Sequence, residues 1–196
     1  MTELILIRHG QTEWSRTGRH TGRTDVPLTE AGRAQAAALA PWVAALSPAH
    51  AITSPLSRAR DTAALAGLAA GVDDRLAEWD YGGYDGLTAA QIQQQRGGRW
   101  TLFADGVPPG ATPGETLAQV ASRASALLTD VAPLLADGPV VLVAHGHLLR
   151  VLVTQWLGFP PHDGAKFVLD PASLSTLGHE HGNPAVLTWN ERPRQV

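Results

Sequence analysis

Two histidines follow directly after hydrophobic runs that lie far apart in the chain. Residues 4–7 lead through an arginine to His9, and residues 140–144 lead directly to His145. A glycine follows each histidine. Because ligands of parallel α/β sheets bind beyond the carboxyl ends of the strands, we expect both histidines to contribute to one site.

The neighbours of His9 favour chemistry on an anion. Arg8 supplies a fixed cation, Gly10 would let a ligand approach the backbone, and Gln11 and Thr12 add neutral hydrogen-bonding groups. A histidine in this setting is a poor metal ligand and a suitable nucleophile toward phosphorus. The residue types alone leave open a strand-end histidine that bonds only to the backbone.

Arg58 lies at the start of a predicted helix, in its first turn. A cation there opposes the helix dipole, which favours anions. The placement is useful when the guanidinium and the free helix N–H groups point at one bound anion. The alternative, a solvated surface arginine, describes Arg60 more naturally.

An acid is expected from the glycine- and aromatic-rich segment 78–86. Glu78, Asp80 and Asp85 all lie there, and Trp79 could partly desolvate the carboxyl group of Glu78. Such a carboxyl group is suited to proton transfer. The residues alone do not choose among the three acids.

Two His-X-His spacings raise the alternative of a metal site. His145 and His147 form one pair, and His179 and His181 form the other. Alternate residues of a strand share a face, so either pair could chelate a metal. Neither pair has the clustered aspartates that hydrolytic metal centres use. We therefore predict no metal and no other cofactor, and we expect His179 and His181 at a strand end on the surface.

The chain resembles the histidine phosphatase superfamily, in its phosphoglycerate mutase-like branch. Residues 4–14 resemble the family's signature, and the similarity continues in the family's order through residues 21–29, 54–59, 76–86 and 144–150. A single Arg-His-Gly would be weak evidence. The ordered set covers most of the chain and is specific.

The resemblance implies a role for each of five residues. His9 is the nucleophile that becomes phosphohistidine, and Arg8, Arg58 and His145 hold the phosphoryl oxygens. Glu78 is the acid and base, which resolves the choice among the three acids. The presence of all five argues against the remaining alternative, a catalytically silent binding or scaffold protein.

Two departures from the mutase pattern favour a phosphatase over the alternative, a cofactor-dependent phosphoglycerate mutase. Mutases carry asparagine where this chain has Ser15 and arginine where it has Trp79. Segment 18–25, together with His147, is similar to acid phosphatases and sugar bisphosphatases. The expected partner is a small phosphorylated metabolite, most of all a sugar phosphate. The residues expected to bind it are Gln11, Thr12, Ser15, His20, Thr21, Gly22, Tyr81, Gly146 and His147.

Alternating strand and helix signals predict an α/β fold, with a mainly parallel sheet between two helical layers. We expect one domain over residues 1–196, with 97–115 as an active-site loop or small lid. Thr29 and Ser57 are each expected at the N-cap of a helix. Pro133 is expected to fray the last turn of the helix at 116–135. Helices are predicted at 30–46, 58–66, 88–96, 116–135 and 147–157, and strands at 4–7, 51–53, 140–144, 173–177 and 185–189.

Composition narrows the protein class further. A net charge of −3 argues against a nucleic-acid binder. No apolar run approaches the roughly 18 residues of a membrane span, so no membrane partner is expected. The absence of cysteine excludes disulfides, a thiolate zinc site and a cysteine nucleophile. With no room for a signal peptide before residue 4, we expect a cytoplasmic enzyme. The sequence does not decide between a monomer and a homodimer.

Overall fold

Six strands form one mixed sheet in the computed structural model, which describes residues 3–193. Their order across the sheet is β3-β2-β4-β1-β5-β6. Strands β1 to β4 run parallel to one another, whereas β5 is antiparallel to both β1 and β6. The bounds are β1 Leu4–Arg8, β2 His50–Thr53, β3 Gly71–Val72, β4 Val140–Ala144, β5 Leu174–Glu180 and β6 Asn183–Glu191.

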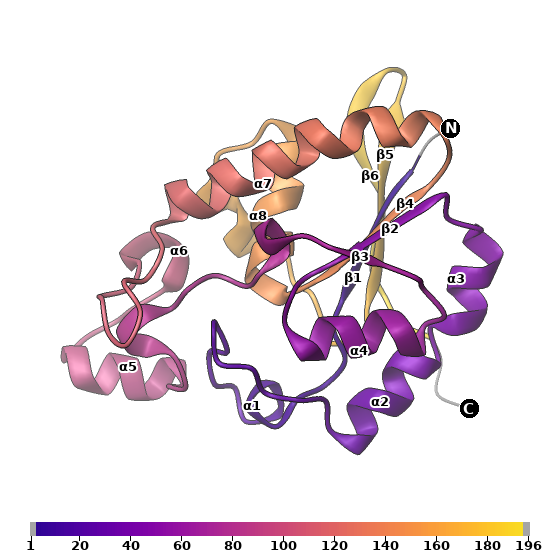
Figure 1. Ribbon diagram of the computed structural model, residues 1–196. Helices are drawn as coiled ribbons and strands as arrows, with labels where there is room; N and C mark the ends of the chain where they lie inside the picture. The colour runs from indigo at the N-terminus through magenta and orange to yellow at the C-terminus, as the bar shows by residue number, and fades with distance from the viewer. Residues whose placement is uncertain (1–2, 194–196) are drawn as a thin grey trace.

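Helices cover both faces of this sheet (Figure 1). The α-helices are α1 Glu13–Arg16, α2 Glu30–Ala37, α3 Ala40–Leu46, α4 Ser57–Leu65, α5 Ala89–Arg96, α6 Leu102–Asp105, α7 Leu117–Val131 and α8 Gly146–Leu157. Four 3-10 helices complete the described chain, η1 Asp74–Leu76, η2 Gly82–Tyr84, η3 Ala132–Ala136 and η4 Pro161–Lys166.

The central strands send alternate side chains into two separate cores. Leu4 and Leu6 of β1 belong to the core beneath α7 and α8. Ile5 and Ile7 belong to the core beneath α3 and α4. All four side chains are fully buried, as the two-residue period of a strand requires for a sheet covered on both faces. The predicted three-layer α/β fold is therefore confirmed.

The single helix predicted at 30–46 is wrong, because the chain breaks it into α2 and α3 at residues 38–39. Pro41 lies in the first turn of α3. Proline lacks the N–H of an interior helical bond, and its ring would clash with the carbonyl of Ala37. Thr29 does cap α2, since its hydroxyl accepts a hydrogen bond from the amide of Gly32 at 3.0 Å.

Two other helix boundaries differ from the predictions. Leu56, not Ser57, occupies the N-cap position of α4, and it makes no side-chain cap bond. The Ser57 amide and hydroxyl instead both donate to Asp25, at 2.9 and 2.8 Å. Helix α7 ends at Val131, and Pro133 lies in the first turn of η3.

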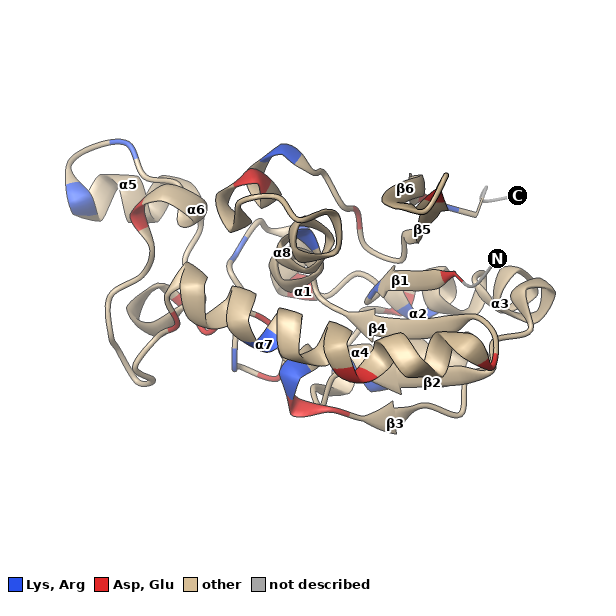
Figure 2. Ribbon diagram, turned by 90° about the horizontal axis from the view of Figure 1, so that it is seen from above, with Lys and Arg blue, Asp and Glu red and all other residues tan. Residues whose placement is uncertain are grey.

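Segment 97–115 is anchored against the loop that carries Glu78. It contains α6, and together with α5 it lies beyond one end of the sheet (Figure 2). The amide of Gly83 donates to the carbonyl of Pro108 at 2.8 Å. Gly82 has a φ of +53°, and a Cβ there would lie 2.2 Å from the same carbonyl oxygen. This turn therefore requires glycine, and it joins the two loops tightly.

Within residues 3–193, the search for a helix both long enough and apolar enough to span a bilayer finds none.

Candidate active site

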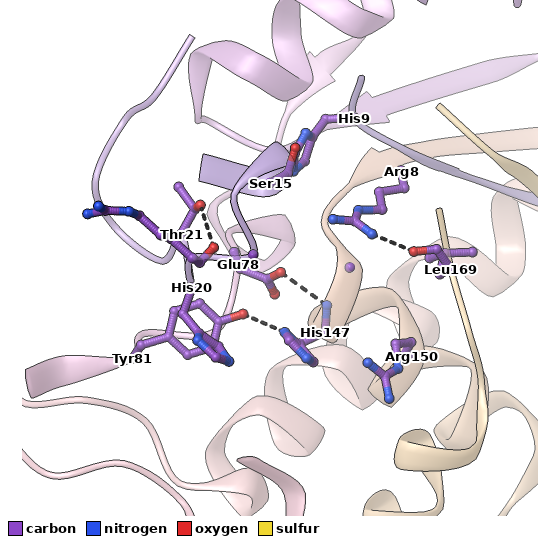
Figure 3. A pocket seen from close by; sticks show the side chains of 13 residues that line it. Arg8, His9, Ser15, His20, Thr21, Glu78, Tyr81, His147, Arg150 and Leu169 are labelled. Carbon is purple, nitrogen blue, oxygen red and sulfur yellow. Dashed lines mark hydrogen bonds between the residues drawn. The ribbon is translucent and has the colours of Figure 1, made fainter. Parts of the chain in front are cut away.

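A pocket of about 190 Å³ opens where β1 and β4 end (Figure 3). Its walls come from the β1 end, the loop after α1, the loop after η1 and the first turns of α8. This is the position predicted from the topology of parallel sheets. The lining residues are Arg8, His9, Ser15, Gly18, Arg19, His20, Thr21, Glu78, Tyr81, Gly146, His147, Arg150 and Leu169.

His9 is held with one ring nitrogen toward the backbone. Its Nδ1 lies 2.7 Å from the carbonyl oxygen of Gly10. A carbonyl oxygen only accepts, so Nδ1 carries the proton and Nε2 carries the lone pair. Burial, assisted by the charges of Arg58 and Arg8, lowers the pKa of His9 well below its usual value. The ring is therefore neutral, with its lone pair on Nε2.

His145 lies beside His9, with 5.1 Å between the ring centroids. Its Nδ1 accepts a hydrogen bond from Nε of Arg58 at 3.2 Å, so the proton is on Nε2. That Nε2 donates to the hydroxyl of Ser54 at 2.7 Å. Burial and the Arg58 charge lower the pKa of His145 well below its usual value. Both nitrogens of this neutral ring are thus engaged within the protein.

Arg58 is a fully buried cation whose one ion pair among the described residues is long. The carbonyl oxygens of Thr21, Gly22 and Thr24 accept hydrogen bonds from its guanidinium at 3.0–3.1 Å. Its nearest acid among the described residues is Asp25, at 3.9 Å. Burial lowers the pKa of Arg58. The loop before α2 therefore orients a positive charge that has only one long ion pair, with the half-exposed Asp25.

Arg8 is the second cation, and it is partly buried. Its Nη1 donates to the carbonyl of Leu169, and within residues 3–193 its buried Nε has no hydrogen-bond partner. Burial lowers the pKa of Arg8. The guanidinium lies against Gly146, where a Cβ would come within 3.3 Å of it. Buried donors are normally hydrogen-bonded, so this Nε is available to an acceptor on a ligand.

Glu78 caps the N-terminus of α8. Its Oε1 accepts hydrogen bonds from the amides of Trp79 and Leu148, both at 2.9 Å, and its Oε2 accepts one from His147 at 3.0 Å. The amides of a first helical turn have no partner within the helix, and the helix dipole favours a negative charge there. The carboxylate is therefore fixed at the pocket wall between two elements far apart in sequence.

An ion pair holds the segment that carries Glu78. Arg123 and Glu115, whose side chains are 14% and 15% exposed, are joined at 2.8 Å. Arg123 also donates to the carbonyl of Ala77 at 2.7 Å, and Glu115 accepts from the amide of Asp80 at 2.9 Å. These contacts fix the backbone on both sides of Glu78.

Aromatic and imidazole rings form the pocket wall opposite His9 (Figure 3). The Tyr81 hydroxyl lies 2.6 Å from Nδ1 of His147, and the rings of His20 and His147 stack with centroids 5.9 Å apart. Trp100 packs edge-on against His20, and Phe103 packs against His147. Segment 97–115 therefore supports this wall from behind.

The structure brings together most of the predicted site residues but not all. Five predicted residues do not line the pocket: Gln11, Thr12, Gly22, Arg58 and His145, the last two being fully buried behind His9. Thr12 is fully buried as the N-cap of α1, and Gln11 accepts from the hydroxyl of Thr29 at 3.1 Å. The carbonyl of Gly22 accepts a hydrogen bond from Arg58.

The expectation that Gly10 lets a ligand approach the backbone is wrong. Its amide donates to the hydroxyl of Thr62, and a Cβ would lie 2.4 Å from the carbonyl of Gly32. The glycine permits close packing against α2 and leaves no open amide for a ligand.

Sequence reasoning missed Gly18, Arg19, Arg150 and Leu169 as lining residues. A signal existed for Arg150, which follows His147 by three residues in a helix. Residues three apart lie on the same helix face. No comparable signal marks Leu169. It is far from Arg8 in the sequence, yet its carbonyl accepts a hydrogen bond from Arg8.

Known proteins resemble this chain over nearly its full length. An acid phosphatase of Mycobacterium tuberculosis is 41% identical over 198 residues, covering 98% of this chain and 95% of that protein. The sedoheptulose 1,7-bisphosphatase of Saccharomyces cerevisiae is 34% identical over 185 residues, covering 79% of this chain and 67% of that protein. The solved structure of a mycobacterial glucosyl-3-phosphoglycerate phosphatase with VO3 superimposes with a TM-score of 0.84 at 33% identity, covering 97% of this chain and 99% of that chain.

Fold, pocket and relatives together define the class of this protein as a phosphoric monoester hydrolase. The family model of the histidine phosphatase superfamily (branch 1) matches residues 4–192. The chain belongs to this family, and the resemblance found in the sequence is confirmed.

Proposed function

We propose that this protein is a metal-independent phosphatase that hydrolyses phosphate esters of small metabolites, above all sugar phosphates, through a phosphohistidine on His9. The observation that carries the proposal is the charge around that ring. Two guanidinium groups, the fully buried Arg58 and the partly buried Arg8, flank a neutral imidazole, and Arg8 keeps an unpaired buried Nε among the described residues. A phosphoryl group supplies the missing anion.

The first chemical step is attack by Nε2 of His9 on phosphorus, which breaks the bond from phosphorus to the ester oxygen. Glu78, entering the step protonated, gives its proton to the leaving oxygen. Oε2 suits this role, because it accepts only one amide bond whereas Oε1 accepts two. The two guanidinium groups stabilise the charge that spreads over the phosphoryl oxygens.

The second step returns the enzyme to its starting state. The Glu78 carboxylate takes a proton from water, the oxygen of that water attacks phosphorus, and the bond from phosphorus to Nε2 breaks. Inorganic phosphate leaves, and His9 is again neutral. Positive charge comes from arginine in both steps, which supports independence of a metal ion.

The pocket supports a small substrate. Its volume of about 190 Å³ is below the range of roughly 300–1,000 Å³ typical of drug-sized ligands. Ser15, His20, Thr21, Tyr81 and His147 line the space that the organic part would occupy. Relatives that are named as acid phosphatase and sugar bisphosphatase support the same substrate class.

Trp79 supports hydrolysis over the alternative, phosphoglycerate mutase activity. The indole is fully buried and donates to the carbonyl of Glu115 at 2.8 Å. At this position no guanidinium reaches the pocket to bind a substrate carboxylate.

The test is a phosphate-release screen over sugar phosphates, sugar bisphosphates, phosphoglycerates and nucleotides, with and without EDTA. We expect release of free phosphate, unchanged by EDTA. Interconversion of 2- and 3-phosphoglycerate with little free phosphate would favour the mutase. Complete loss of activity in EDTA would contradict metal independence.

A further inference from the structure

Arg150 is a cation of the pocket wall that the mechanism above does not use. It lies on α8 one turn after His147, and both side chains line the pocket (Figure 3). Within the described chain it forms no ion pair, because every acid lies beyond 4.0 Å of it. Burial lowers the pKa of Arg150, so the protein bears an energetic cost to keep this charge in place.

The guanidinium of Arg150 is held rigidly on one side. Its Nε donates to the carbonyl of Gly164 at 2.9 Å, and its Nη2 donates to the carbonyl of Ala165 at 3.1 Å. Its centre also lies 4.8 Å above the ring of Phe103. Among the described residues, Nη1 has no hydrogen-bond acceptor. A preorganised cation with a free donor loses little entropy when it binds an anion.

The pocket holds more positive charge than one phosphate ester requires. Its lining includes Arg8, Arg19 and Arg150 and one acid, Glu78, whose carboxylate is already bound by three amides. Arg8 lies beside the nucleophile and serves the phosphoryl group that is removed. Arg150 lies toward the His147 side of the pocket, away from His9 (Figure 3). A second acidic group on the substrate would meet it there.

We propose that Arg150 is a specificity-determining residue that binds a second acidic group of the substrate, a carboxylate or a further phosphate. This inference rests on the proposed phosphatase function and narrows its substrate class. The preferred substrates are small phosphate esters that bear one more anionic group a few bonds from the phosphate. The competing explanation is that Arg150 only ties α8 to η4 through the two carbonyl bonds.

Kinetics on matched substrates separate these explanations. The substrates are 3-phosphoglycerate with a carboxylate, fructose 1,6-bisphosphate with a second phosphate, and glycerol 3-phosphate with neither. Arg150→Gln should lower kcat/KM about 10- to 100-fold on one or both of the first two, as expected for one charge-assisted hydrogen bond. Turnover of glycerol 3-phosphate should fall by a clearly smaller factor, because that substrate has no second acidic group. The substrate that loses most identifies the second group.

Two controls guard the interpretation. Arg150→Lys keeps the charge and should retain part of the preference, whereas Arg60→Gln removes an exposed arginine on α4 and should change none of the three values. Thermal unfolding of each variant shows whether the fold is intact. Equal losses on all three substrates, or no loss on any, would overturn the proposal.

A binding measurement keeps this inference separate from the phosphatase proposal. Calorimetric titration of His9→Ala with 3-phosphoglycerate, fructose 1,6-bisphosphate and glycerol 3-phosphate needs no turnover. Adding Arg150→Gln should weaken binding of at least one of the first two and leave glycerol 3-phosphate unchanged. If wild-type protein releases no phosphate from any substrate, the phosphatase proposal fails, and this titration still decides the role of Arg150. If His9→Ala binds each of the three ligands equally well with and without Arg150→Gln, the proposed role of Arg150 is refuted.

Discussion

The carboxylate of Glu78 lies 2.9 Å from the amide of Leu148, so the proposed proton donor is also the cap of helix α8. That helix begins directly after His145. The two halves of the pocket, one from the segment after η1 and one from the β4 end, are therefore joined by the reacting group itself. Its position depends on backbone amides, which substitutions of side chains do not remove.

Glu78→Gln separates these two roles. The glutamine carbonyl can still accept the two amide bonds of Oε1, but its NH2 group would face the amide of His147, and the side chain no longer transfers a proton. We expect kcat to fall about 10²- to 10⁴-fold, the usual contribution of a general acid and base, with a loss of about 1–3 kcal/mol in the free energy of unfolding for the one lost amide bond. Steady-state kinetics and a melting curve measure both effects. A variant that keeps near wild-type kcat would refute the assignment of Glu78.

Arg123→Met tests the ion pair that grips the Glu78 segment. Removing one partner leaves a largely buried carboxylate on Glu115 and two carbonyls without their donor. We expect a loss of about 3–5 kcal/mol in the free energy of unfolding, together with a lower kcat. Urea denaturation measures the loss.

The matched control for this prediction is Arg16→Met, which breaks an exposed ion pair with Glu13. We expect no measurable change in its free energy of unfolding. If the two variants lose equal stability, the buried pair has no special role.

As the pH is lowered, the free energy of unfolding should begin to decrease at a higher pH than protonation of carboxylates alone would cause. Burial lowers the pKa of His9, His145 and His147 well below their ordinary value, and it also lowers that of His20. Below about pH 6.5 the unfolded chain binds protons that these folded histidines do not, so stability falls as pH falls. Above that pH these histidines no longer reduce the free energy of unfolding.

Urea denaturation at about pH 7.5 and about pH 5.5 measures this effect, because ordinary carboxylates remain ionised over that range. We expect a lower free energy of unfolding at the lower pH, and a smaller difference in His20→Gln. Equal stability at the two pH values would contradict the buried, neutral state of the histidines.

The sequence was sufficient to predict the parts of the fold that depend on local patterns. The runs at 4–7 and 140–144 are strands, and their ends bring His9 and His145 to ring centroids 5.1 Å apart. The position of Pro41 could have predicted the break between α2 and α3, since proline does not continue a helix. That signal was present but outweighed by the alanine-rich pattern around it.

Contacts that depend on the path of distant segments were not predictable from local patterns. Arg123 lies on α7 like any other helical arginine, and its pairing with Glu115 matters only because the Glu78 segment runs beside both. Gln11 and Thr12 looked like ligand donors because they follow His9. Packing against α2 and capping of α1 use their polar groups instead.

The most direct test of the account is chemical trapping of the phosphoenzyme. Wild-type protein is mixed with a rapidly hydrolysed substrate, quenched in alkali to preserve phosphohistidine, digested and analysed by mass spectrometry. We expect one phosphoryl group on the peptide that contains His9, and neither phosphorylation nor turnover in His9→Ala. Full turnover by His9→Ala, or a phosphoryl group on another residue of the wild-type protein, would contradict the central claim.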